Sequence, residues 1–131
     1  MKIYPKLPQR SEELGKMIVE AAYQVHKNIG PGLLESIYEK CLIYELKKMG
    51  LTVESQVEIP FSYNGKNINI SLRLDILVEK SVIIEAKSVE SILPVHKAQL
   101  ISYLKLTNNR LGFLINFNVP LIKEGIHRFV N

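Results

Sequence analysis

The sequence predicts a single α/β domain in which helices flank a central mixed sheet, with elements in the order ααβββαβ(β). Three observations support this prediction. Apolar residues recur at helical spacing up to Gly50 and at a spacing of two after it, Asn64-Gly65 signals a hairpin, and a helix then separates two apolar strands. The chain has 131 residues, 47% hydrophobic and 23% charged, which is typical of one soluble domain.

The first predicted element is a helix that begins at Ser11 and ends near Asn28. Its apolar residues, from Leu14 to Val25, follow the i, i+3, i+4, i+7 spacing of one buried face. Ser11 suits the N-cap, and residues 29–32 (Ile-Gly-Pro-Gly) end the helix. We therefore expect a short extended arm over residues 1–10 and a single domain over residues 11–131.

A second helix is predicted from Leu33 to Met49, closed by Gly50. Its apolar residues, including Cys41, lie on one side, and Glu39 falls with the lysines on the solvated side. Cys41 is the only cysteine, so the chain has no internal disulfide, and we expect it in the reducing cytoplasm.

The strands begin after Gly50. Val53–Tyr63 and Ile68–Val78 form a hairpin, because Asn64-Gly65 suits a primed turn with positive φ at both central residues. Val82–Lys87 is a largely apolar third strand, as expected inside a sheet. The remaining predicted elements are a helix over Pro94–Leu106, a strand over Gly112–Phe117 and a fifth strand over Gly125–Val130.

Alternation along two of these strands separates their charged residues from their apolar ones. Leu72, Leu74, Ile76 and Val78 share one face, which leaves Asp75 on the other, while Glu85 and Lys87 share a face of the next strand. A three-residue turn at residues 79–81 places Asp75 opposite Glu85, whereas a two-residue turn sends Glu85 to the other side. We expect the first register.

Two carboxylates opposite each other in a half-buried ladder repel, and desolvation adds to the cost, so the pair is disfavoured by about 1 kcal/mol unless a cation bridges it. Oxygen ligands without paired His or several Cys favour Mg²⁺ or Mn²⁺ over zinc. Lys87, two residues after Glu85, is placed to hold a phosphate oxygen or to orient an attacking water.

Asp75 followed after ten positions by Glu85-Ala86-Lys87 resembles the core of the PD-(D/E)XK nuclease superfamily. Residues 32–38 (Gly-Leu-Leu-Glu-Ser-Ile-Tyr) reproduce the GxxExxY signature of the small GxxExxY protein family within it. The resemblance covers about Ile18 to the C-terminus, and it departs from the pattern only in having Leu74 where a proline is usual. It implies a restriction-endonuclease-like fold and metal-dependent cleavage of phosphodiesters in nucleic acid, with DNA expected rather than RNA.

The resemblance also implies a role for particular residues. Asp75 and Glu85 would be metal ligands, Glu35 would join them directly or through water, and Lys87 would be the catalytic lysine. The backbone carbonyl of Ala86 would be a third ligand, Gln99 would point at the site, and Tyr38 would pack beside it. The expected metal is Mg²⁺ or Mn²⁺.

Simpler explanations exist for the same residues. Asp75, Glu85 and Lys87 could form a surface ion cluster, and Glu35 could only complement the helix dipole. His96, Gln99 and Tyr103 share a helical stripe, although a first-turn histidine there is equally often solvated. The competing function is a non-catalytic module that binds nucleic acid or protein on the same fold.

The net charge of +4 permits a nucleic-acid partner without requiring one. The sequence predicts no membrane span and no signal peptide. We expect apolar residues such as Leu33, Leu51 and Phe129 to be exposed, which would allow the chain to form a homodimer. The basic residues expected around the rim of the site are Lys87, Lys97, Lys105, Arg110, Lys123 and Arg128.

Overall fold

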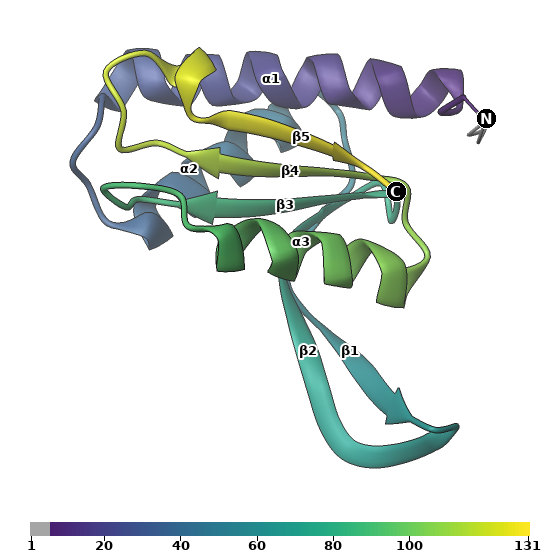
Figure 1. Cartoon of the computed structure of the whole chain (residues 1–131). Coiled ribbons are helices and arrows are strands. Elements are labelled where there is room, and N and C mark those ends of the chain that lie inside the picture. The colour runs from purple at the N-terminus through teal and green to yellow at the C-terminus, as the bar shows by residue number, and fades with distance from the viewer. Residues whose placement is uncertain (1–5) are drawn as a thin grey trace, which may run out of the picture.

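The computed structural model describes residues 6–131, so the first half of the predicted N-terminal arm lies outside the described residues. A five-stranded sheet in the order β1-β2-β3-β4-β5 forms the centre. Figure 1 shows α1 and α2 on one side of this sheet and α3 on the other. The helices are α1 (Gln9–Ile29), α2 (Glu35–Lys48) and α3 (Pro94–Thr107), and the strands are β1 (Val53–Tyr63), β2 (Lys66–Val78), β3 (Val82–Lys87), β4 (Leu111–Asn116) and β5 (Ile126–Val130). A short 3-10 helix, η1 (Ile122–Glu124), precedes β5.

The sheet is mixed, as predicted. The strand β2 runs antiparallel to both β1 and β3, α3 provides the crossover that makes β4 parallel to β3, and β5 returns antiparallel to β4. This arrangement confirms the predicted α/β class with a central mixed sheet between helices. Asn64 and Gly65 both have positive φ, which confirms the hairpin turn.

Each face of the sheet has its own apolar core. On the α1 and α2 side, Ile76, Val78, Ile84 and Ala86 pack with the buried stripes of both helices. On the other side, Leu77, Ile83 and Leu114 pack with Leu100 and Leu104 of α3. The two faces of β2 and β3 therefore bury their apolar side chains in two separate layers. Neither layer readily accommodates a charged side chain.

Two details of the sequence prediction are wrong. The first helix begins at Gln9 after Pro8, and Ser11 is a buried residue inside its first turn without any side-chain cap. Leu74 packs in the α3-side core, although strict alternation would place it with Ile76 in the other. The alternation fails at Asp75, between these two residues, which has no partner in the ladder with β1.

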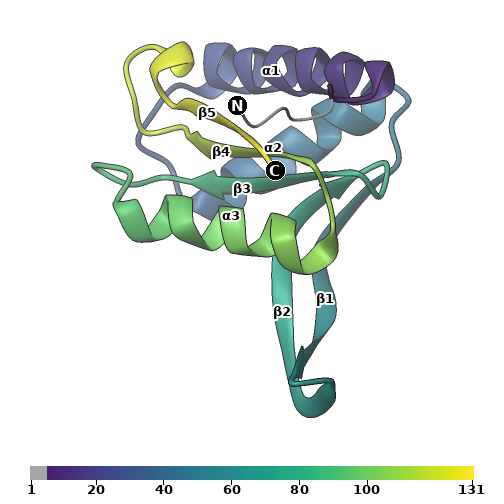
Figure 2. The same ribbon diagram turned by 45° about the vertical axis from the view of Figure 1, so that its right-hand side comes forward.

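The hairpin of β1 and β2 extends well beyond the rest of the molecule. Both views show its far half projecting as an arm away from the helices (Figures 1 and 2). Side chains near its tip, such as Tyr63, Ile68 and Ile70, are more than half exposed. Within residues 6–131, no helix combines the length and apolar character needed to cross a bilayer.

Candidate functional site

The site begins at an interruption in the ladder between β1 and β2. Paired residues on either side of it are Ser55 with Ile76 and Val57 with Leu74, while Gln56 and Asp75 between them form no pair in the register. Gln56 has a φ of 51°, which is uncommon for a residue other than glycine. The interruption releases Asp75 from regular pairing and brings its amide and carboxyl group to a neighbouring side chain.

That neighbouring side chain is Glu85 of β3. The register of β2 and β3 pairs Val78 with Val82 and Ile76 with Ile84, so the turn has the three residues that the sequence prediction required. Glu85 interacts by hydrogen bonds with both the side chain and the backbone of Asp75. The two carboxyl groups therefore lie together, as predicted.

Glu85 is the most perturbed acid of this site. Its side chain is only 4% exposed, and Oε1 is buried without a hydrogen-bond partner. Desolvation, followed by the hydrogen bond and the charge of Asp75, raises the pKa of Glu85 to about 9, although the Lys87 charge opposes part of this rise. At neutral pH and without a cation, the pair therefore retains a proton that two solvated carboxyl groups would lose.

Lys87, at the end of β3, is held in place by the neighbouring strand. It pairs with Asn116, and its carbonyl accepts a hydrogen bond of 2.9 Å from the amide of Phe117. The buried Asn116 side chain donates to the carbonyl of Val89 at 2.9 Å and accepts from the Val89 amide at 3.1 Å. These bonds fix the backbone at Lys87 and just after it.

The helix α2 contributes acids from its first two turns. Glu35, its first residue, is exposed, and the next acid, Glu39, is half-buried. Burial is the main cause that raises the pKa of Glu39, and the charges of Asp75 and Glu35 raise it further. The charges of both Glu35 and Asp75 therefore act on Glu39, which is half-buried on the side of the helix that the sequence predicted to be solvated.

Gln56 connects Glu39 to the interrupted strand. Its Nε2 donates a hydrogen bond of 2.8 Å to Oε1 of Glu39. The spacing of four residues between Glu35 and Glu39 on one helix face could have indicated the second acid. The irregularity at Gln56 has no comparable sequence signal.

The helix α3 approaches the carboxyl pair through Tyr103. Burial, followed by the charge of Glu85, raises the pKa of this phenol. Gln99 Nε2 donates to Tyr103 Oη at 3.1 Å, so Gln99 is connected to the site through the tyrosine. His96 accepts a hydrogen bond from the Leu93 amide at Nδ1, 3.0 Å away, and so serves the start of the helix.

Tyr38 has the packing role that the sequence predicted. It is fully buried and stacks on Phe117, with ring centroids 4.7 Å apart. Its hydroxyl donates to the carbonyl of Gly30 and accepts from the amide of Leu33, 3.1 Å away. The tyrosine of the GxxExxY pattern thus closes the loop that leads into α2, upstream of Glu35.

The chemistry of the Asp75 and Glu85 pair fits a divalent cation with oxygen ligands. A buried carboxylate oxygen without a partner and a neighbouring like charge are both relieved when such an ion binds. Across residues 6–131, however, no three Asp, Glu, His or Cys side chains are gathered closely enough to enclose a metal. The pair is therefore an open site that leaves further coordination positions to water or substrate.

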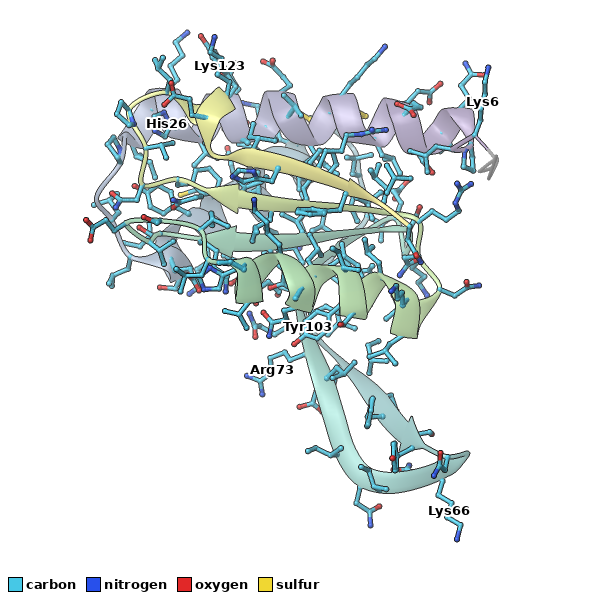
Figure 3. All side chains as sticks on the ribbon, viewed as in Figure 1. Lys6, His26, Lys66, Arg73, Tyr103 and Lys123 are labelled. Carbon is cyan, nitrogen blue, oxygen red and sulfur yellow. The ribbon has the colours of Figure 1, made fainter. Side chains whose placement is uncertain are left out.

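The basic residues are distributed differently from the expected rim. Lys123 lies beside α1, on the far side of the molecule from Tyr103 (Figure 3), and Arg128 pairs with Glu12 of α1 at 3.1 Å. Arg73, which sequence reasoning did not select, projects from the base of the arm below Tyr103 (Figure 3). Its side chain is 63% exposed, and its pairing with Glu58 is loose, at 3.7 Å.

Comparison with known proteins bears on the same residues. A family model described as the PD-(D/E)XK nuclease superfamily matches residues 12–129, which include every site residue described above. No curated protein gives a significant match.

Proposed function

Because the chain belongs to the PD-(D/E)XK nuclease superfamily, we propose that it hydrolyses phosphodiester bonds in nucleic acid, with DNA as substrate and Mg²⁺ or Mn²⁺ as cofactor. The finer assignment to the GxxExxY family within that superfamily is part of the proposal, and so is a single domain over residues 11–131. The observation that carries the proposal is the pair of Asp75 and the buried Glu85: the unpartnered oxygen and the raised pKa of Glu85 would both be relieved by a bound cation.

Each residue of the site would have its own role in the reaction. Asp75 and Glu85 would hold the metal, with the carbonyl of Ala86 and Glu35 as further oxygen donors directly or through water. A divalent ion at this position supplies Lewis-acid activation of water and neutralises charge that develops on the phosphoryl group. Lys87, whose charge already acts on Glu85, would orient the attacking water and hold a phosphate oxygen.

The α3 side would provide the wall of the site. Tyr103 and Gln99, linked at 3.1 Å, would exclude water from the carboxyl pair on that side and offer a hydroxyl and an amide to the substrate. Glu39 would add negative charge behind Asp75 and strengthen cation binding.

Cleavage of plasmid and of single-stranded DNA in Mn²⁺ tests this function. Wild type should cleave, whereas Asp75→Ala and Lys87→Ala should lose at least about a hundredfold of the rate, as expected when electrostatic stabilisation of the transition state is removed. The control is Glu45→Ala, because Glu45 lies on α2 and pairs with Lys48 at 4.0 Å. Equal activity in all four proteins would overturn the mechanism.

A non-catalytic binding module is the second candidate, and the lack of three converging acids in the described residues favours it. Titration calorimetry distinguishes the two. If Mg²⁺ and Mn²⁺ fail to bind at millimolar concentration while DNA binds with a steep dependence on salt, the chain is a binding module. Metal binding that requires Asp75 supports the nuclease.

A further inference from the structure

The arm formed by β1 and β2 has one polar and one apolar face. Side chains directly opposite in an antiparallel pair share a face, and the pairs Ile59 with Leu72 and Phe61 with Ile70 follow Val57 with Leu74 on one of them. The other face carries Glu58 with Arg73 and Pro60 with Ser71. The arm face is the set Val57, Ile59, Phe61, Ile70 and Leu72.

The arm face continues the core on the α3 side of the sheet. Val57 and Ile59 pack against the cluster that contains Leu100 and Leu104, so the apolar surface leaves the interior and runs outward along the arm. Exposure increases in the same direction, from 0% at Leu74 to 57% at Ile70. A two-stranded hairpin is marginally stable in water unless such a face is covered.

The helix α3 exposes a second apolar surface. Its Val95 and Leu106, which helical spacing places on one side of the helix, are 64% and 51% exposed, while Leu93 at its start is 51% exposed. The arm leaves the molecule directly below this helix (Figures 1 and 3). One chain therefore presents an apolar arm and an apolar helix surface next to each other, and it covers neither.

We propose that a second copy of this chain covers both surfaces, with the arm face of each copy packed on the outer side of α3 of the other. The two surfaces belong to the same chain, so a twofold arrangement satisfies both at once. Ile70, Leu93, Val95 and Leu106 expose on the order of 100 Å² each, together about half of the roughly 800 Å² per partner of a standard interface, and the partly exposed rest of the arm face adds to this area. The arm face carries no charge, which argues against nucleic acid as its occupant.

This dimer differs from one built on the exposed residues that the sequence suggested. Leu51 is buried with 6% exposure, and Phe129 packs partly against the α3-side core. Neither residue is available as the centre of an interface. The interface proposed here is independent of catalysis, so its test does not require nuclease activity.

Sedimentation of the full chain at micromolar concentrations tests the proposal. Wild type should be a dimer, and Ile70→Glu and Leu106→Glu should each weaken it by at least about a hundredfold, because a buried unpaired charge costs several kcal/mol. Ser71→Glu places the same charge next to Ile70 on the polar face and should remain dimeric. Ile70 and Leu106 are each more than half exposed, so the fold should persist in both variants. Circular dichroism checks this.

Cross-linking then identifies the contact. In a Cys41→Ser background, a chain with Ile70→Cys is mixed with a differently tagged chain with Leu106→Cys, and a bifunctional thiol reagent should give mixed covalent dimers. A monomeric wild type would overturn the proposal. So would a dimer that Ile70→Glu leaves intact, or cross-linking between Ile70→Cys chains with no mixed product.

Discussion

Gln56 Nε2 of β1 donates a hydrogen bond of 2.8 Å to Glu39 Oε1 of α2, beside the point where Asp75 leaves the ladder. The bond connects an irregular strand to a half-buried acid whose pKa is raised by burial and by the charges of Asp75 and Glu35. This hydrogen bond therefore couples the irregular backbone of β1 to the acidic residues around the proposed metal site.

The first prediction concerns the charge of Glu39. Glu39→Gln keeps an oxygen that can accept from Gln56 but removes a negative charge near Asp75, so Mn²⁺ affinity should fall about fivefold, equivalent to about 1 kcal/mol. Calorimetric titration measures it. Glu45→Gln, on the same helix and paired with Lys48 at 4.0 Å, should bind Mn²⁺ as wild type does. Equal losses in both variants would remove any special role for Glu39.

The second prediction follows from the raised pKa of Glu85. The unfolded chain releases this proton near the ordinary pKa of 4.5, whereas the folded chain holds it to about 9. Because the folded state binds more protons between these values, its stability is fully present below the lower pKa and decreases as pH rises through the window. One proton contributes a slope of at most about 1.4 kcal/mol per pH unit.

Urea unfolding from pH 5 to pH 9 without divalent ions measures this slope. Glu85→Gln should reduce it, since the amide does not titrate, and Glu13→Gln on the exposed face of α1 should leave it unchanged. Metal binding at pH 7 should release a proton from the pair, which calorimetry in buffers of different ionisation heat detects. A stability of wild type that rises across the window would contradict the assignment.

The prediction from sequence was most successful where local patterns decide the structure. Asn64-Gly65 fixes the hairpin turn, and the three residues at 79–81 fix the register that pairs the strands of Asp75 and Glu85. Leu74 is the residue whose position strict alternation predicted wrongly. Strict alternation assumes a regular ladder, but Gln56, with positive φ, and Asp75 are unpaired in that ladder, and Gln56 also contacts Glu39 of the preceding helix, which no local strand pattern indicates.

The third prediction tests the tyrosine of the GxxExxY pattern. Tyr38→Phe keeps the stacking on Phe117 but leaves the Gly30 carbonyl and the Leu33 amide without this partner. The free energy of unfolding should fall by about 1–2 kcal/mol in urea titration. The exposed Tyr44→Phe serves as the control and should change it by less than about 0.5 kcal/mol. Identical stabilities would mean that the hydroxyl does not hold the loop.

The fourth prediction assigns substrate contact to Arg73. Its guanidinium projects below Tyr103 from the strand that carries Asp75 (Figure 3), and its loose pairing with Glu58 leaves it available to a phosphate. In Ca²⁺, Arg73→Gln should bind short DNA duplexes less tightly, and the slope of log affinity against log salt should become shallower by about one. Fluorescence anisotropy measures both quantities.

Lys123→Gln provides the matched control, because Lys123 lies beside α1 on the far side from Tyr103 (Figure 3). It removes the same unit of net charge, so a general effect of protein charge would lower affinity equally in both variants. A local phosphate contact lowers it only in Arg73→Gln. If the two salt slopes are the same, Arg73 makes no local phosphate contact, and the substrate does not pass the base of the arm.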